Sequence, residues 1–213
     1  MTCSQPIESF PPDTETSPMT KRILVVALLA AAGVSPAFAE GVAYRIDPNH
    51  TVVLATWNHF GYSNPSANFG GASGTIVYDA AAPEKSSVEV VLPMSGLDTF
   101  VPKLDEHLKT ADFFDADKYP QATFRSTSVK SLGDGRLEVT GTLDLHGVQA
   151  PVVLDAKLNK AAPGEGDRPA KIGFDATATV KRSEFGISRL VPMIGDDVAL
   201  RITTEASAAK AAQ

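Results

Sequence analysis

Four histidines are the residues of this chain that most readily suggest chemistry, either as metal ligands or as acid–base groups. They are His50, His59, His107 and His146. Their spacing matches no helical or short-loop pattern of metal ligands, which argues against a metal site. His50 and His59 lie at the two ends of one expected strand. Three roles remain possible for them: structural hydrogen bonding, contact with a ligand headgroup, or a zinc site. We expect His107 to be exposed or capping on a helix and His146 to lie in a turn.

An acidic run and one arginine offer two further candidates. The run consists of Asp112, Asp115 and Asp117. It lacks the glycine and the distal glutamate of an EF-hand, so we expect helix capping and solvent exposure. Arg182, in "KRSEF" at the end of an expected strand, has two open roles. It pairs either with an anionic headgroup or, on the surface, with Asp175, Asp155 or Glu184.

The sequence gives little support for catalysis. Ser95 and Ser183 lack the context of a nucleophile elbow, and no glycine-rich phosphate loop precedes a helix. The only cysteine, Cys3, lies in a segment that we expect to be removed. We therefore predict no catalytic residue, no metal, no cofactor and no enzymatic activity.

The N-terminal segment has the features of an export signal. Lys21 and Arg22 precede an apolar run over residues 23–34, and "AFA" at 37–39 has the small-x-small form that signal peptidase cuts. The run is shorter than the ~20 residues of a membrane-spanning helix, which argues against a retained anchor. We predict export by a signal peptide over 19–39 that is cleaved after Ala39. Residues 1–18 are either a disordered leader or a mispredicted start, with Met19 as the alternative start.

The elements that position these residues are mostly strands. Apolar and polar residues alternate along nearly all of 40–213, which we expect to form a single domain. The chain has 19 basic and 25 acidic residues without a basic cluster, so we expect no nucleic-acid partner. The expected strands are 43–47, 51–59, 67–79, 86–93, 121–130, 136–146, 148–159, 169–182 and 197–207.

One stretch departs from the alternation. Val101, Leu104 and Leu108 follow helical spacing, with Pro102 tolerated in a first turn, which predicts a short helix over about 101–109. A lone helix among alternating strands favours an all-β antiparallel barrel with a helical plug or lid. Many residues on the expected inner faces are small, which favours a cavity, but plugging of the barrel by the helix or loops stays open.

Five segments in order resemble the YceI-like, or polyisoprenoid-binding, family of exported proteins with a lipocalin-like barrel. Thr51, where a serine is usual, and Trp57-Asn58 depart from the family pattern. If Trp57 points inward, it takes up cavity volume. The segments are "YRIDPNHTVV" (44–53), "NHFGYSNPSANFGGASGTIVYD" (58–79), "LDEHLKTADFFDADKYPQATFRSTSV" (104–129), "VTGTLDLHGVQAPVVL" (139–154) and "KRSEFGISRL" (181–190).

The resemblance implies an extended barrel of about eight strands around an apolar tunnel that sequesters an isoprenoid or similar lipid. The expected lipid is polyprenyl, quinone-like or fatty acyl, and the resemblance also suggests a periplasmic location and a homodimer. Transient contact with a membrane is a further expectation. Of Phe113 and Phe114, we expect one to anchor the helix and the other to line the tunnel. The expected headgroup contacts are His50, His59 and Arg182. The expected lining residues are Val53, Ala55, Trp57, Phe69, Phe113, Phe114, Phe124, Val139, Leu143, Val152, Leu154, Phe174, Ala176 and Phe185.

Two rival functions remain at this point. One is an enzyme or redox partner that acts on a bound quinone, with His50 or His59 as the proton donor. The other is a stress-related interaction protein whose barrel is filled by its own side chains. A barrel filled by its own side chains would favour the second rival, whereas an open apolar cavity would favour a lipid carrier.

Overall fold

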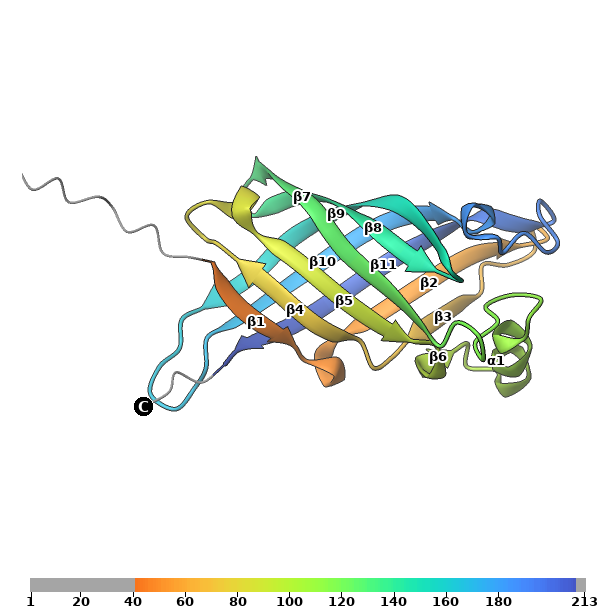
Figure 1. The fold of residues 1–213 in the computed structure, drawn as a ribbon, viewed down its shortest axis with the longest axis horizontal. Helices are drawn as coiled ribbons and strands as arrows, with labels where there is room; N and C mark the ends of the chain where they lie inside the picture. The colour runs from red at the N-terminus through yellow and green to blue at the C-terminus, as the bar shows by residue number, and fades with distance from the viewer. Residues whose placement is uncertain (1–40, 210–213) are drawn as a thin grey trace, which may run out of the picture. The chain divides into compact units, whose positions relative to one another are not determined.

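The structure is a computed structural model and describes residues 41–209. The predicted leader at 1–18 and the predicted signal peptide at 19–39 lie outside the described residues. Within them, eleven strands form one antiparallel sheet (Figure 1). The strands are β1 (Val42–Ile46), β2 (Val52–His59), β3 (Ser66–Phe69), β4 (Ser73–Tyr78), β5 (Ser87–Pro93), β6 (Leu97–Asp98), β7 (Gln121–Gly133), β8 (Arg136–Leu145), β9 (Val148–Ala162), β10 (Lys171–Lys181) and β11 (Ile194–Ala208).

The sheet closes into an eight-stranded barrel, as the sequence predicts. The order β1-β4-β5-β7-β8-β9-β10-β11 returns to β1, where Tyr44 pairs with Ala208. Three of the eight barrel strands are bent, and each consists of two consecutive strands separated by a break. These pairs are β1 with β2, β3 with β4, and β5 with β6. Closure satisfies the backbone groups that an open sheet would leave at its edges.

The breaks explain why the expected strand over 67–79 is two strands. Gly71 has a φ of +75°, which a residue with a side chain rarely adopts. Beside it, the backbone N–H of Gly70 donates to the carbonyl of Gly96 at 2.9 Å. A Cβ on Gly96 would collide with the Gly70 carbonyl. The two backbone segments can therefore approach this closely only because residue 96 is glycine.

The alternation of residues determines which face of each strand points inward. On β10, Ile172, Phe174, Ala176 and Val180 are buried, while the residues between them are exposed or half-buried. The tight turn between β8 and β9 preserves this register, because His146 and Gly147 both have positive φ, as a two-residue type I′ turn requires.

The helix α1 (Pro102–Lys109) confirms the helix expected from the sequence. It follows β6 and lies at one end of the barrel, on the right of Figure 1. The carboxylate of Asp105 accepts hydrogen bonds from the backbone N–H and the hydroxyl of Thr99, both at 2.6 Å. These bonds hold the pKa of Asp105 below its usual value and fasten the helix to the end of β6. Leu108 is buried against the barrel.

Candidate functional site

Two apolar cavities occupy the inside of the barrel. The larger, about 500 Å³, lies at the α1 end, and the smaller, about 160 Å³, lies toward the opposite end of the barrel. Val53, Leu92, Leu143 and Leu200 line both cavities, and we call these four side chains the waist. The barrel is therefore not packed solid with its own side chains. The larger volume falls within the ~300–1,000 Å³ range of typical small-molecule sites.

Thirteen of the fourteen side chains predicted to line a tunnel border these cavities. The larger is lined by Val53, Ala55, Trp57, Phe69, Phe113, Phe114 and Leu143. The smaller is lined by Val53, Phe124, Val139, Leu143, Val152, Leu154, Phe174 and Ala176. Phe185 borders neither cavity and lies in the packed core with 1% of its surface exposed.

Pairs of alanines on adjacent strands create the free volume. Ala55 on β2 faces Ala67 on β3 across the larger cavity wall, and Ala156 on β9 faces Ala176 on β10 across the smaller one. Each pair places two methyl groups where larger side chains would fill the barrel. The interior is therefore unfilled because alanines, and not larger residues, occupy these paired positions on the inner face.

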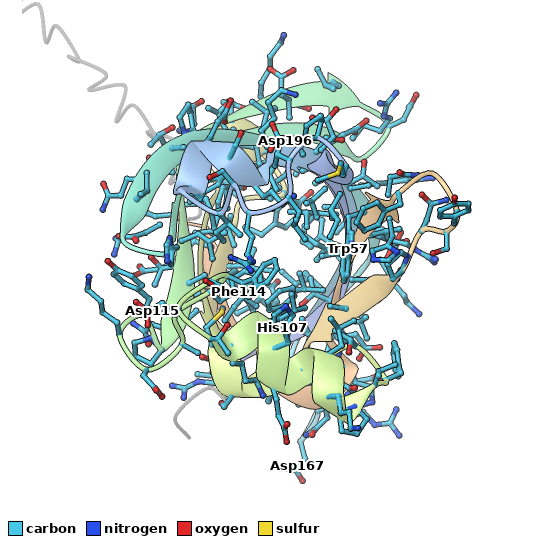
Figure 2. All side chains as sticks on the ribbon, turned by 90° about the vertical axis from the view of Figure 1, so that its right-hand side faces the viewer. Trp57, His107, Phe114, Asp115, Asp167 and Asp196 are labelled. Atoms are coloured by element: carbon cyan, nitrogen blue, oxygen red, sulfur yellow. The ribbon has the colours of Figure 1, made fainter. Side chains whose placement is uncertain are left out.

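The segment around α1 forms one wall of the larger cavity. Phe113 and Phe114 both line it, so the expected division into one anchoring and one lining ring does not hold. The ring of Phe114 meets Phe69 edge-on at 5.8 Å, and the ring of Phe113 meets His107 edge-on at 5.0 Å. Figure 2, which faces this end of the barrel, shows Trp57, His107 and Phe114 around an opening. His107 is exposed, as expected, and it also borders the cavity.

The titratable side chains that line the larger cavity are His59, His107 and Arg182. No carboxylate from the described residues lines it. In the smaller cavity the titratable group is Tyr78, and burial raises the pKa of its hydroxyl. Of the two cavities, only the larger is therefore lined by described side chains that can carry a positive charge.

Arg182 is buried and anchors the loop between β10 and β11. Its Nε donates to the carbonyl of Gly195 at 2.9 Å and its Nη2 to that of Ile194 at 2.9 Å. Its Nη1 donates to the carbonyls of Ile187 and Arg189 at 2.8 and 3.0 Å. Burial lowers the pKa of this guanidinium, and one Nη2 hydrogen has no recorded acceptor among the described residues.

The surface ion pair considered for Arg182 does not form. Asp155 instead pairs with Arg136 at 3.0 Å on the outside of the barrel. The carboxylate next to Arg182 in space is that of Asp196, which accepts from the backbone N–H and the hydroxyl of Ser183 at 2.9 and 2.8 Å. Burial raises the pKa of Asp196, but these hydrogen bonds outweigh burial and hold it below the usual value.

The remaining polar candidates lie away from the cavities. Nδ1 of His50 contacts a carboxylate oxygen of Asp47 at 2.8 Å, and neither cavity includes His50. His146 donates from Nδ1 to the carbonyl of Phe185 at 3.0 Å, a structural role in its turn. Asp112 pairs with Arg189 at 3.4 Å.

Residues 41–209 contain neither a metal-binding cluster nor a membrane-spanning helix. No three His, Cys, Asp or Glu side chains gather there in an arrangement that holds a metal ion. No helix in this part of the chain is long and apolar enough to span a membrane.

Several lining residues were not singled out from the sequence. Val198 and Leu200 stand on the apolar face of β11, and alternation alone could have found them. Leu104 and Leu108 stand on the predicted face of α1. Leu92 continues the alternation of Val88 and Val90 on β5, so it too could have been found. Met94 carries no such signal, because it lies in the 3-10 helix Met94–Gly96 at the bend between β5 and β6, which the sequence does not reveal.

Comparisons with known proteins identify the family. The model of the YceI-like domain matches residues 44–206. A UPF0312 protein of Pseudomonas savastanoi pv. phaseolicola is 39% identical over 174 residues, which cover 79% of this chain and 88% of the relative.

Solved structures agree with this match. The crystal structure of a Campylobacter jejuni YceI protein is 34% identical, with a TM-score of 0.66, over 72% of this chain and 90% of that one. A polyisoprenoid-binding domain from Saccharophagus degradans has the same fold, with a TM-score of 0.62 at 16% identity, over 79% and 99% of the two chains. By its sequence match over most of the barrel, this chain belongs to the YceI-like family.

Proposed function

We propose that this protein binds a lipid by enclosing its apolar chain in the two cavities, and that it carries or stores that lipid without a chemical step. The observation that carries the proposal is the pair of apolar cavities of about 500 and 160 Å³, which share the four side chains of the waist as a common wall. Support also comes from the polyisoprenoid-binding domain that shares the fold, which makes an isoprenoid the first class of ligand to test.

The cavity sizes suggest how such a chain is held. If a methylene takes about 30 Å³, as a water molecule does, the larger cavity holds roughly fifteen to seventeen carbons and the smaller about five. Each methylene transferred from water contributes ~0.8 kcal/mol. A chain that reaches the waist therefore binds through burial alone, with its length limited by the barrel.

The polar groups suggest where the head of the lipid lies. His59 and Arg182 line the larger cavity, together with His107, and no carboxylate from the described residues lines it. A head that is anionic or accepts hydrogen bonds suits this set, because Arg182 brings a buried positive charge and one free N–H. His50, also proposed from the sequence, lies outside the cavities and drops out of the headgroup site.

We further propose that binding takes place in the periplasm. The proposal rests on the basic, apolar and small-residue pattern of residues 21–39, which lie outside the described residues. N-terminal sequencing of the protein recovered from a periplasmic extract tests it. We expect an N-terminus at Glu40, and an intact residue 19 or 1 in the cytoplasmic fraction alone would contradict it.

Trp57 provides a direct test of lipid binding, because it is the only tryptophan of the chain and lines the larger cavity. We expect polyprenols added to delipidated protein to change its fluorescence saturably at one per chain. At ~0.8 kcal/mol per carbon, affinity should rise by up to roughly a thousandfold per five-carbon isoprene unit until the cavities are full. Ala55→Leu, which fills part of the larger cavity, should weaken binding, whereas Val153→Leu on the exposed outer face should not. No response to any chain length would overturn the proposal.

A further inference from the structure

The two loops beside the opening of the larger cavity form an apolar lip. They are residues 60–65, between β2 and β3, and residues 186–193, between the 3-10 helix Arg182–Phe185 and β11. The backbone N–H of Phe60 donates to the carbonyl of Met193 at 3.0 Å, which joins the two loops. Four large apolar side chains of the lip are exposed: Phe60 by 44%, Tyr62 by 92%, Leu190 by 40% and Met193 by 54%.

The apolar surface of the lip is continuous with the cavity. Phe60 and Leu190 line the cavity and are also exposed, so their side chains face both the inside and the outside of the barrel. When a lipid chain leaves a bilayer through water, each methylene exposed to water lowers the equilibrium constant for that step by a factor of roughly four. A lip that touches the bilayer removes this barrier because the chain passes from one apolar surface to the next.

The charges of the lip also distinguish it from the rest of the chain. The two loops contain no Asp or Glu, although the exposed Glu184 and Asp197 lie just outside the second loop. Their one full charge, Arg189, is paired with Asp112. The whole chain has a net charge of −6. The loops at the opposite end of the barrel, 79–86 and 163–170, contain four acidic residues, Asp79, Glu84, Glu165 and Asp167, and two basic residues, Lys85 and Arg168. Tyr62 places an aromatic ring with a polar tip at the end of its loop, which is typical of residues at a membrane interface.

We propose that this lip docks onto the surface of a lipid bilayer and that the bound chain enters and leaves the barrel there. The inference deepens the proposed function and rests on it for the identity of the cargo. The segment 112–117 beside α1 carries three aspartates, so the lip, and not the whole rim, makes the contact. Because its apolar side chains and not its charges drive the contact, neutral vesicles suffice.

The test uses two variants that leave the cavity lining intact. Tyr62 and Met193 do not line the cavity, so the double variant Tyr62→Ser/Met193→Ser removes exposed apolar surface without changing the site. Leu132→Ser is the matched control, because Leu132 is 45% exposed beside the β7–β8 turn at the opposite end. Both variants keep the same N-terminal segment as the native chain, so a difference between them comes from the lip.

Partitioning onto phosphatidylcholine vesicles is measured by co-sedimentation. We expect the double variant to bind roughly tenfold more weakly than the native chain, and Leu132→Ser to bind as the native chain does. Transfer of a labelled prenol from vesicles should slow in the same order. The Trp57 titration with a prenol in solution should give the same affinity for all three proteins.

Three results would overturn the proposal. The first is equal vesicle binding by the native chain and the double variant. The second is binding only to vesicles with anionic lipid and its loss in high salt. The third is a native dimer that the double variant converts to a monomer, which would make the lip a contact between copies. Failure of the proposed function is distinguishable, because it would appear as a native chain that binds vesicles but shows no Trp57 response to prenols.

Discussion

The substitution Ala176→Leu probes the smaller cavity. Ala176 on β10 is buried, lines that cavity and pairs with Ala156 on β9, so its methyl group faces free volume. Leucine adds three carbons, or ~90 Å³ at about 30 Å³ each, which is more than half of the 160 Å³ available. Thr177→Leu is the matched control, because its side chain is exposed on the outer face of the same strand.

The expected effects on stability and on binding have opposite signs. Filling the void should stabilise the ligand-free protein by about 1 kcal/mol, as cavity-filling substitutions commonly do. Displacing three methylenes of a chain that passes the waist should weaken its binding by about 2.4 kcal/mol, or roughly fifty-fold. A chain short enough to end before the waist should lose nothing, because it never reaches the smaller cavity.

Two assays separate these effects. Urea unfolding of delipidated protein gives the change in stability, and Trp57 titrations with prenols of ten to twenty-five carbons give the change in affinity at each length. A variant that binds short and long chains equally poorly would refute the reasoning. So would a variant that loses stability, because leucine would then meet a packed interior and not a void.

Three further predictions concern the barrel wall and its loop. Arg182→Met leaves four carbonyls without their donor and should lower the free energy of unfolding by about 3 kcal/mol or more; a loss under about 1 kcal/mol in urea would contradict the anchoring role. Gly141→Ala should destabilise the barrel by about 1–3 kcal/mol in thermal unfolding, because its Cβ would collide with the Phe124 ring and lie 2.6 Å from the Arg125 carbonyl; unchanged stability would mean that the ring moves freely. The pKa of Asp196 is lower when folded than its ordinary 3.8, so its stabilisation is present above pH 3.8 and is lost as the pH falls through the folded pKa. Asp196→Asn should therefore lower stability at pH 7 and reduce its acid dependence, and an unchanged acid transition would contradict this.

The period of two in the sequence was sufficient to predict the barrel and most of its interior. Phe174 and Ala176 alternate with exposed residues on a long strand, and both line the smaller cavity as expected. The helix was predictable for a similar reason, since Leu104 and Leu108 follow helical spacing. Regular elements carry a periodic signal that shows which side faces inward.

The sequence was least informative where the chain is irregular. Arg182 appears in the sequence as one more charged residue at a strand end, but four carbonyls of a folded loop surround it. Phe185 has the residue type of a lining side chain, yet it lies in a 3-10 helix, Arg182–Phe185, that turns it into the packed core. The division into two cavities depends on contacts across the barrel, which no local pattern records.

The content of the barrel in cells tests the central claim most directly. The protein is purified without detergent, extracted with organic solvent, and its lipids are quantified against the protein by mass spectrometry. We predict close to one equivalent of a lipid with a single long apolar chain, lost selectively from Ala55→Leu and retained by Val153→Leu. Native protein that yields no lipid, and whose Trp57 does not respond to added prenols, would contradict the account.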